Sequence, residues 1–341
     1  MQMKNKSILY LAIIVVLGAI AYFQMSSNEN FGPRSDRRDF AIADTSKVTK
    51  VILTSKFPEV AVIERQSEDS WLLNDTYKAR KSAVYYLLQT IHRMEIAHPV
   101  PLSMRENVLG NLAIKGIKVE VFMEGGQKKT FYVGGENQQL TATFMMLQNS
   151  SEPYALHILG FKGYLSGRFF TQEHLWRDKL VMSFDNREIA DIQMEYFDPN
   201  ERKESFSIKL KNEDYILRSL KEQDVFKADS SSLTSYLASF RNLYSEGFIS
   251  DYDALNTDSL LKATPYFELN IKNKKGKEIH LRTFYKRAKP GTEVNGEIVM
   301  RDPDRYFAQI NNNDIVLIQK QTFKKIIKGL SYLQENPIVK K

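Results

Sequence analysis

The 341-residue chain contains no cysteine and few residues of the kinds that build reactive sites. Without cysteine it can form no disulfide, no thiolate metal site and no lipid-modified cysteine, so lipoprotein attachment is excluded. Only five histidines are present, and no two have the HExxH spacing of a zinc enzyme. The sequence also lacks a P-loop, a GxGxxG motif and a GxSxG nucleophile elbow. These absences exclude the enzyme classes that short motifs identify.

Two polar groupings remain as candidates for chemistry. His174 and Asp178 lie four apart on a possible helix, as a catalytic dyad or as a surface i,i+4 pair. Residues 251–258 (DYDALNTD) suggest a calcium loop, but they lack the glycine and the terminal glutamate of an EF-hand. Turn formation and helix capping before Ser259 explain that stretch better. We therefore expect no catalytic residue, no cofactor and no metal ligand.

The main feature that is present is an apolar run near the N-terminus, ILYLAIIVVLGAIAYF, at residues 8–23. As a helix it would span about 24 Å, close to the ~30 Å hydrocarbon core of a bilayer. Lys4 and Lys6 precede it, which favours a cytoplasmic N-terminus. We predict that residues 1–25 anchor the chain in the inner (cytoplasmic) membrane as a single span, with its bulk in the periplasm or extracytoplasmic space. The residues expected within the bilayer include Ile8, Leu11, Ile14, Val15, Leu17 and Phe23.

A cleaved signal peptide is the alternative interpretation of this run. Residues 19–21 (AIA) have the small–x–small pattern of a cleavage site after Ala21. The apolar run continues past that site through Tyr22 and Phe23, which favours a retained anchor. Both interpretations place the rest of the chain outside the cytoplasm.

The rest of the chain has the composition of a folded protein. Residues 26–39 (SSNENFGPRSDRRD) are polar and predict a flexible linker. The whole chain is 43% hydrophobic and 11% aromatic, and its length suits two domains with separate cores. The net charge of +7 comes without a nucleic-acid recognition motif, so we expect no nucleic-acid partner.

The densest basic cluster comprises Lys272, Lys274, Lys275 and Lys277. Such a cluster can contact anionic lipid or another polyanion. It can equally be the solvated tip of a hairpin in which Gly276 makes the turn. A short cluster carries little specificity, so the hairpin tip is the preferred interpretation.

The region after the linker repeats itself at an offset of 141 to 150 residues. Trp71 in EDSWLL corresponds to Tyr215 in NEDYIL, and Tyr154 in EPYALHI corresponds to Tyr306 in DRYFAQI. The matched apolar positions are Val48, Val51 and Leu53 with Ile189, Ile192 and Met194, and Val60 and Val62 with Phe206 and Ile208. The order of these matches along the chain indicates an internal duplication.

Each copy has the pattern of strands, one helix and a hairpin. Amphipathic helices are expected near 79–95 and 229–244. Hairpins are expected at 118–133 with a turn at Gly125-Gly126, and at 267–281 with a turn at Gly276. Residues 134–135 (GG) and 302–304 (DPD) are expected to form further turns.

These patterns predict an α+β fold. An N-terminal transmembrane helix would precede two similar, mostly antiparallel sheet-plus-helix units. Trp71 and Tyr215 are expected to cover the seam between helix and sheet, with ligand stacking as the alternative. The expected divisions are an anchor at 1–25, a linker at 26–39, units at 40–180 and 181–335, and a basic tail at 336–341.

The N-terminal anchor, the repeated strand–strand–aromatic–helix unit with its SWLL and DYIL segments, and the LWRDK segment at residues 175–179 form a recognisable combination. It resembles the uncharacterised family known as domain of unknown function 4340, over about residues 40–330. Tyr215 stands where that family usually has tryptophan. Members are often encoded beside gliding-motility-type ABC transporters, so the resemblance implies a membrane-associated accessory role. The family brings no established catalytic residues.

We therefore expect a non-enzymatic, membrane-anchored protein that binds components of an ABC-type transport or gliding-like envelope complex. A module that binds envelope glycan or another ligand is the alternative, with Trp71, Trp176 and Tyr215 as possible contacts. A hydrolase acting on envelope polymers is a further alternative, which would need a deep cleft with convergent acid–base groups.

Overall fold

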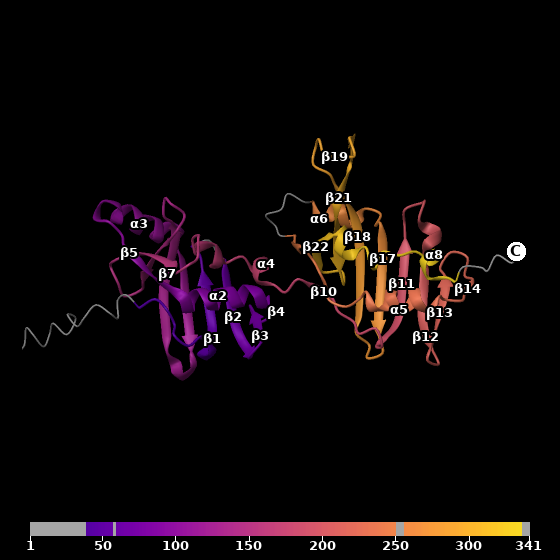
Figure 1. Ribbon diagram of the computed structural model, residues 1–341, viewed down its shortest axis with the longest axis horizontal. Helices are drawn as coiled ribbons and strands as arrows, with labels where there is room; N and C mark the ends of the chain where they lie inside the picture. Colours follow the sequence, from indigo (N-terminus) through magenta and orange to yellow (C-terminus); the bar gives the residue numbers. More distant parts are fainter. Residues whose placement is uncertain (1–38, 57–58, 250–255, 336–341) are drawn as a thin grey trace, which may run out of the picture. The chain divides into compact units, whose positions relative to one another are not determined.

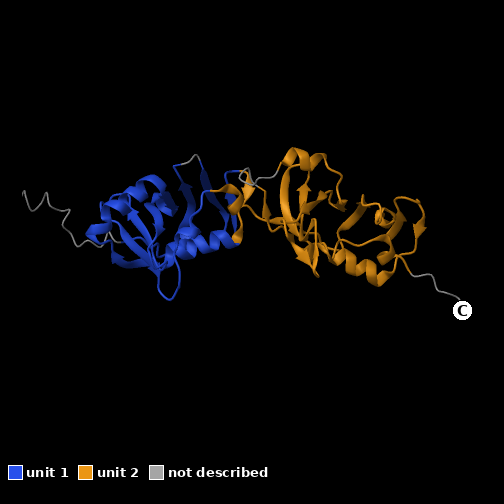
Figure 2. Cartoon of the chain, turned by 90° about the horizontal axis from the view of Figure 1, so that it is seen from above, with its two compact units in different colours: residues 1–75, 82–171 blue, residues 76–81, 172–341 orange. Residues whose placement is uncertain are grey.

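The computed structural model describes residues 39–56, 59–249 and 256–335 (Figure 1). Within them the chain forms two compact units (Figure 2). The first comprises the described residues up to 75 together with 82–171, and the second comprises 76–81 and the described residues from 172 onward. The expected anchor at 1–25, most of the linker, the start of the acidic loop at 250–255 and the basic tail at 336–341 lie outside the described residues.

Among the described residues, the first large sheet has nine strands in the order β4-β3-β2-β1-β6-β7-β8-β9-β5. Its strands are β1 (Val48–Thr54), β2 (Val60–Ser67), β3 (Ser70–Leu73), β4 (Tyr77–Lys78), β5 (Met94–Pro99), β6 (Ile117–Met123), β7 (Lys128–Glu136), β8 (Thr143–Leu147) and β9 (Tyr154–Ile158). The helices of this unit are α2 (Lys81–Arg93) and α3 (Leu102–Lys115). Strand β4 and the first residue of α2 belong to the second unit.

The second large sheet, counted over the same described ranges, also has nine strands, in the order β14-β13-β12-β11-β17-β18-β21-β22-β16. Its strands are β11 (Ile189–Tyr196), β12 (Phe206–Lys211), β13 (Asp214–Ser219), β14 (Val225–Phe226), β16 (Gly247–Phe248), β17 (Phe267–Asn273), β18 (Glu278–Arg287), β21 (Arg301–Ile310) and β22 (Asp314–Gln319). Two small sheets pair β10 (Leu180–Met182) with β15 (Leu243–Tyr244), and β19 (Glu293–Val294) with β20 (Glu297–Ile298). The helices are α4 (Glu173–Trp176), α5 (Ser230–Ala238), α6 (Thr257–Lys262), α7 (Lys320–Phe323) and α8 (Leu330–Leu333).

The two sheets have the same strand order. Numbered from the first strand of each large sheet and in chain order, both read 4-3-2-1-6-7-8-9-5. The register also breaks at the same place, between Val48 and Lys50 where β1 meets β6, and between Ile189 and Asp191 where β11 meets β17. A bulge changes the twist of a strand and the direction of its side chains, so its position is a specific feature of a sheet. The chain is α+β with mostly antiparallel pairing, as the sequence predicted.

Alternating apolar residues of the central strands form the cores. Val51 of β1 pairs with Val121 of β6, and Ile192 of β11 pairs with Ile271 of β17. All four side chains are buried. The second core also takes in Tyr236 and other residues of α5, so this helix covers the core face of its sheet. The expected hairpins at 118–133 and 267–281 are confirmed as β6–β7 and β17–β18.

One expected match between the copies is wrong by one residue. The repeat predicts that Val60 corresponds to Phe206, and that Val62 corresponds to Ile208. Phe206 pairs with Met194 in the second sheet, and at that place in the first sheet Ala61 pairs with Leu53. Ala61 is buried, whereas Val60 is 42% exposed. The segment VAVI is apolar throughout, so its composition does not tell which residues face inward; only the register does.

The expected match of Tyr154 with Tyr306 is also wrong. Tyr154 begins β9, whereas Tyr306 lies in β21, which takes the place of β8. The cause is the β19–β20 hairpin, which the second unit inserts between β18 and β21. Before it, Tyr132 corresponds to Arg282, an offset of 150; after it, Met146 corresponds to Gln309, an offset of 163. A constant offset therefore aligns the wrong strands.

Three local expectations also differ from the structure. The helix expected at 229–244 ends at Ala238, and its apolar continuation reaches β15 instead. Gly134-Gly135 lie inside β7 and not in a turn. Residues 302–304 lie inside β21, where the Asp302 carboxylate accepts hydrogen bonds from the next backbone amides. Both stretches lie where the register shifts, at Val133/Glu136 in β7 and opposite Tyr285/Arg287 in β21, so each interrupts the pairing without ending its strand. The contacts of Asp302 are those of an Asx turn.

The structure also contains α3, a helix that the sequence patterns did not predict. Its apolar periodicity is weak and a glycine lies in its middle, so it lacks a clear amphipathic pattern. Pro99 and Pro101 just before it were an available signal for a helix start. Over residues 39–56, 59–249 and 256–335, no helix is both long and apolar enough to cross a bilayer.

Candidate functional site

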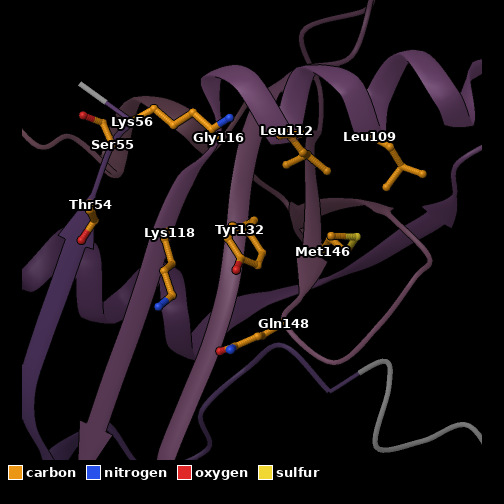
Figure 3. Close-up of a pocket in the computed structure, with 11 residues that line it drawn as sticks. Thr54, Ser55, Lys56, Leu109, Leu112, Gly116, Lys118, Tyr132, Met146 and Gln148 are labelled. Atoms are coloured by element: carbon orange, nitrogen blue, oxygen red, sulfur yellow. The ribbon is translucent and has the colours of Figure 1, made fainter. Parts of the chain in front are cut away.

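A groove with a volume of about 590 Å³ lies between α3 and the sheet of the first unit (Figure 3). We call it the α3 groove. It lies within the ~300–1,000 Å³ range of small-molecule pockets. Figure 3 shows Leu109 and Leu112 extending from α3 toward strands that carry Tyr132 and Met146. Its lining is completed by Thr54, Ser55, Lys56, Ala113, Gly116, Lys118 and Gln148.

Two glycines set the position of α3. Gly116 ends the helix, and its backbone N–H donates to the Leu112 carbonyl at 3.0 Å. A Cβ at Gly116 would lie 2.2 Å from that same oxygen. Gly134 of β7 lies beneath the helix, and a Cβ there would come within 2.9 Å of the Leu112 Cδ2 atom. A side chain at Gly116 would disrupt the last turn of α3, and one at Gly134 would push α3 away from the sheet.

The floor of the groove is apolar and lies on the face of the sheet opposite the core. Val108 and Leu112 of α3 form a small separate cluster with Val100, against Tyr132 and Met146. Tyr132 and Met146 alternate along their strands with the fully buried Phe131 and Met145. Successive residues of a strand face opposite sides, so α3 covers the second side of the sheet.

One end of the groove has surplus positive charge. Lys118 lies 3.1 Å from the Glu120 carboxylate, and Lys128 lies 2.5 Å from the same oxygen. The hydrogen bond from Lys128 lowers the pKa of Glu120, burial opposes this, and Lys118 lowers it further. Two ammonium groups thus share one carboxylate, and the exposed Lys56 adds a third. Among the described residues that line the groove there is no carboxylate and no imidazole.

The second unit presents a different surface, the β19–β20 hairpin. Figure 1 shows it projecting beyond the sheet between β18 and β21. Asn295 and Gly296 form its two-residue turn, with φ of 52° and 83°. These angles define a type I′ turn, which matches the twist of paired strands. Ile298 and Met300 are each 71% exposed.

The sequence reasoning missed both surfaces. The signal for the hairpin was available, since Asn-Gly between short extended segments is the strongest short-range hairpin pattern. The groove had no comparable signal. It depends on α3 and on side chains from strands that are far apart in the chain.

Residues of the LWRDK segment make several packing contacts and hydrogen bonds within the second unit. Trp176 is fully buried, and its carbonyl accepts a hydrogen bond from the Arg80 N–H at 2.7 Å. The Arg177 guanidinium lies 3.8 Å from the Tyr77 ring centroid and 4.1 Å from that of Phe248. It also donates to Asp314 at 2.6 Å. These structural contacts explain why tryptophan and arginine occupy positions 176 and 177, and they require no ligand.

The three aromatic residues predicted as partner or ligand contacts lie apart from the groove. As whole residues, Trp71 and Trp176 are 5% and 0% exposed, so neither offers a ring face to a ligand. Tyr215 is half-buried, and its hydroxyl donates to the Ile189 carbonyl at 2.8 Å. The predicted anchor residues, Ile8, Leu11, Ile14, Val15, Leu17 and Phe23, lie outside the described residues.

The candidate catalytic pair does not have the geometry expected of it. Helix α4 ends at Trp176, so Asp178 lies beyond it and the i,i+4 arrangement with His174 is not formed. Asp178 instead lies 3.5 Å from Lys78. Of the acidic stretch at 251–258, Asn256 caps α6 by accepting the Ser259 N–H. In the described part of the chain, no group of three or more acidic or histidine side chains has the arrangement of a metal site.

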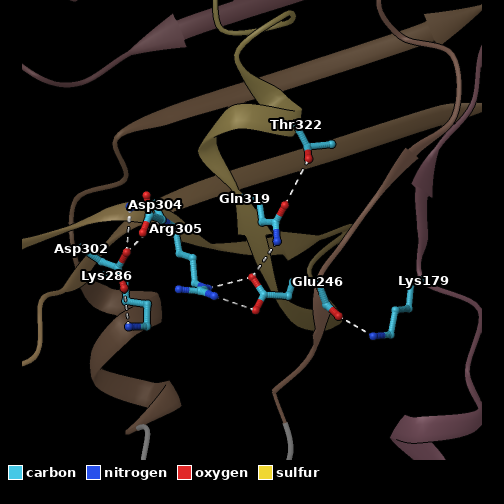
Figure 4. Close-up of polar contacts among 8 residues, drawn as sticks. All are labelled: Lys179, Glu246, Lys286, Asp302, Asp304, Arg305, Gln319 and Thr322. Carbon is cyan, nitrogen blue, oxygen red and sulfur yellow. Dashed lines mark hydrogen bonds and ion pairs between the residues drawn. The ribbon is translucent and has the colours of Figure 1, made fainter.

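A polar network of the second unit joins Glu246, just before β16, to residues of β18, β21 and β22 (Figure 4). Glu246 accepts two hydrogen bonds from Arg305, at 2.7 and 3.1 Å, which lower the pKa of its carboxyl. Asp302 accepts from Lys286 at 2.7 Å and from the N–H groups of Asp304 and Arg305 at 2.9 and 3.0 Å. Each carboxylate is held by cations and amides, as expected of a structural network.

A family model described as Domain of unknown function (DUF4340) matches residues 71–261, from β3 into α6. The match covers more than half of the chain and includes Trp71, Tyr215 and the LWRDK segment. No curated protein and no solved structure matches the chain. On the strength of the family match, the chain belongs to the DUF4340 family.

Proposed function

We propose that this protein is a membrane-tethered, non-catalytic binding protein of the cell envelope, and an accessory component of an ABC-type transport or gliding-like complex. The apolar run at residues 8–23 is the tether, and it holds the folded body in the periplasm or extracytoplasmic space. Tethering raises the local concentration of the body near membrane partners. The transporter as partner is an expectation from the family resemblance.

The observation that carries the binding role is the β19–β20 hairpin. An isolated two-stranded hairpin is marginally stable in water. This hairpin exposes the apolar side chains of Val294, Ile298 and Met300. Polar residues at these positions would disturb no core, so folding does not explain why the residues are apolar. Strands β19 and β20 pair only with each other in their two-stranded sheet, so the outward-facing edge of each strand has no partner strand in that sheet. Apolar side chains beside free strand edges suit strand addition to a protein partner, here an extracytoplasmic part of the permease.

The two units are an internal duplication in this proposal. The identical strand order and the equivalent bulges support it. The hairpin has no counterpart in the first unit, where the turn at residues 137–142 joins β7 to β8 directly. A duplicated scaffold that gains an exposed insertion in one copy fits the use of that insertion for binding.

The test is quantitative co-purification of the full-length protein with a C-terminal tag in mild detergent. The wild-type protein should recover permease and ATPase subunits, identified by mass spectrometry. A variant with Val294→Ser, Ile298→Ser and Met300→Ser should recover at least about tenfold less, because truncating interface anchors typically costs more than 1 kcal/mol each. Leu159→Ser is the matched control, since Leu159 is equally exposed in the first unit. Undiminished recovery by the triple variant would contradict the proposal, and so would wild-type protein that recovers no transport subunit.

A further inference from the structure

The α3 groove is a surface with different chemistry from the hairpin, and an argument built on it does not depend on the hairpin. Its volume is about 590 Å³, with walls from Leu109 and Leu112 and a floor from Tyr132 and Met146 (Figure 3). These side chains leave apolar surface in contact with a solvent-accessible hollow. Such surface favours an apolar occupant.

The fold does not require an apolar floor at this place. One row across the first sheet consists of Lys118, Tyr132 and Met146 on adjacent strands. The corresponding row of the second sheet consists of Glu268, Arg282 and Gln309. There Arg282 donates to Glu268 at 2.8 Å and to Gln309 at 3.5 Å, and the row satisfies its own polar groups. The same sheet position can therefore be polar and closed, and the first unit keeps it apolar and open.

The polar end of the groove selects the charge of the occupant. Lys56 and Lys118 line it together with the hydroxyl groups of Thr54 and Ser55, and no acidic residue lines it. The Glu120 carboxylate that neighbours Lys118 also holds Lys128. Both charged side chains in the described lining, Lys56 and Lys118, are therefore cationic, and Lys118 shares its neighbouring carboxylate with Lys128. An anion placed here meets donors and uncompensated positive charge.

We propose that the α3 groove binds a free long-chain fatty acid, with its hydrocarbon chain between α3 and the sheet and its carboxylate beside Lys56 and Lys118. The groove is a single hollow with one cationic end, which suits one chain with one anionic group. A phospholipid, with two chains and a bulkier headgroup, fits this geometry less well. Lysines provide point charges for a carboxylate without the planar fork of arginine.

The test uses the full chain in nanodiscs of phosphatidylcholine and a palmitic acid that carries a diazirine at mid-chain. After irradiation, labelled peptides are mapped by mass spectrometry. Label is expected on the peptides that carry Leu109, Leu112 and Met146. Ala113→Trp, which fills the groove from α3, should lower this labelling by about tenfold or more. Ile114→Trp is its control, because Ile114 is 63% exposed and does not line the groove.

A second pair of variants tests the charge without altering the packing. The double variant Lys56→Gln and Lys118→Gln should lower labelling several-fold. The control Lys115→Gln should not, because Lys115 lies on α3 but does not line the groove. Absence of label in the groove would overturn the proposal. Equal labelling by a diazirine-bearing palmityl alcohol would overturn the assignment of an anion. Labelling by a diazirine-bearing phosphatidylglycerol but not by the free acid would replace the fatty acid with a membrane lipid.

Discussion

The two large sheets share one strand order, but different side chains complete the face opposite each core. In the first unit, α3 covers that face because Gly134 leaves room for Leu112. In the second, the next strand position after Thr283 carries Phe284, which is buried and has Arg282 over its ring. In chain order, α6 lies between β16 and β17 as α3 lies between β5 and β6, but Phe284 takes the place of the glycine. The α3 groove therefore depends on the room that Gly134 leaves for Leu112, and not on the strand order that both sheets share.

The bulge in the central strand of each sheet is also supported by different side chains in the two units. In the first unit, Arg65 donates to the Val48 carbonyl at 2.6 Å, and its guanidinium lies 4.3 Å from the Trp71 ring centroid. In the second, the hydroxyl of Tyr215 donates to the Ile189 carbonyl at 2.8 Å. Trp71 and Tyr215 hold equivalent positions, since they pair with equivalent residues of the neighbouring strand.

This equivalence explains why tyrosine replaces tryptophan in the second copy. In the first unit the donor to the bulge carbonyl is Arg65, which packs on the Trp71 ring. A tyrosine carries its own donor, and the residue in the place of Arg65 is Leu210. The two solutions satisfy the same buried acceptor with different pairs of residues.

The largest expected effect comes from removing the ring that supports the first bulge. Trp71→Ala should lower the free energy of unfolding of the first unit by about 3–5 kcal/mol, because the ring is almost fully buried and Arg65 packs on it. Urea unfolding followed by pulsed amide hydrogen exchange would report this through peptides of β1 to β3. A loss below about 1 kcal/mol would show that the ring is not part of the core.

The two ways of supporting the bulge can be compared directly by placing the Leu–Tyr pair of the second unit at positions 65 and 71 of the first. Arg65→Leu alone leaves the Val48 carbonyl without its donor and should cost about 1–3 kcal/mol. Adding Trp71→Tyr supplies a hydroxyl in the equivalent place. The double variant should then be more stable than the sum of the two single changes predicts; strict additivity would mean that the two bulges are not supported in the same way.

The next effect concerns the glycine beneath α3. Gly134→Val should destabilise the first unit by about 1–3 kcal/mol, because its side chain would collide with Leu112. Hydrogen exchange in residues 102–115 should accelerate as α3 separates from the sheet. Gly135→Val is the control, since nothing lies within 4 Å of a Cβ at Gly135. Equal effects of the two variants would contradict the role given to Gly134.

The smallest effect is a difference in pH dependence between corresponding connections. In the first unit, the Asn137 amide oxygen accepts the N–H groups of Thr141 and Ala142, at 2.8 and 3.0 Å. In the second, the Asp302 carboxylate holds the base of the insertion. Burial acts to raise the pKa of Asp302, but hydrogen bonds from Lys286 and the following amides outweigh it, so the pKa is lowered below 3.8.

A carboxyl whose pKa is lower in the folded state stabilises the protein above its unfolded pKa of about 3.9, and that contribution disappears as the pH falls through its folded pKa. The stability difference between wild type and Asp302→Asn should therefore be constant above about pH 5 and shrink below pH 4. Urea unfolding at several pH values, read from peptides of β21, measures this. Asn137→Asp in the first unit would introduce the same dependence, and a pH-independent difference for Asp302→Asn would refute the assignment.

The sequence by itself determined the parts of this protein that depend on neighbouring residues. Alternating apolar residues and glycine turns were sufficient for the β6–β7 and β17–β18 hairpins, for α2, and for the α+β class. The equivalence of Trp71 with Tyr215 was also visible, because few insertions separate the copies before that point.

The tertiary structure decided everything that depends on which strands lie side by side. The uniformly apolar VAVI segment faces inward at Ala61 only because of its pairing with Leu53. Arg65 finds the Val48 carbonyl across 17 residues of chain, and Lys118, Tyr132 and Met146 form one row only after three strands have paired. The α3 groove is a product of this pairing and of a weakly patterned helix whose position depends on Gly134. Packing between distant segments, which local patterns do not encode, sets that chemistry.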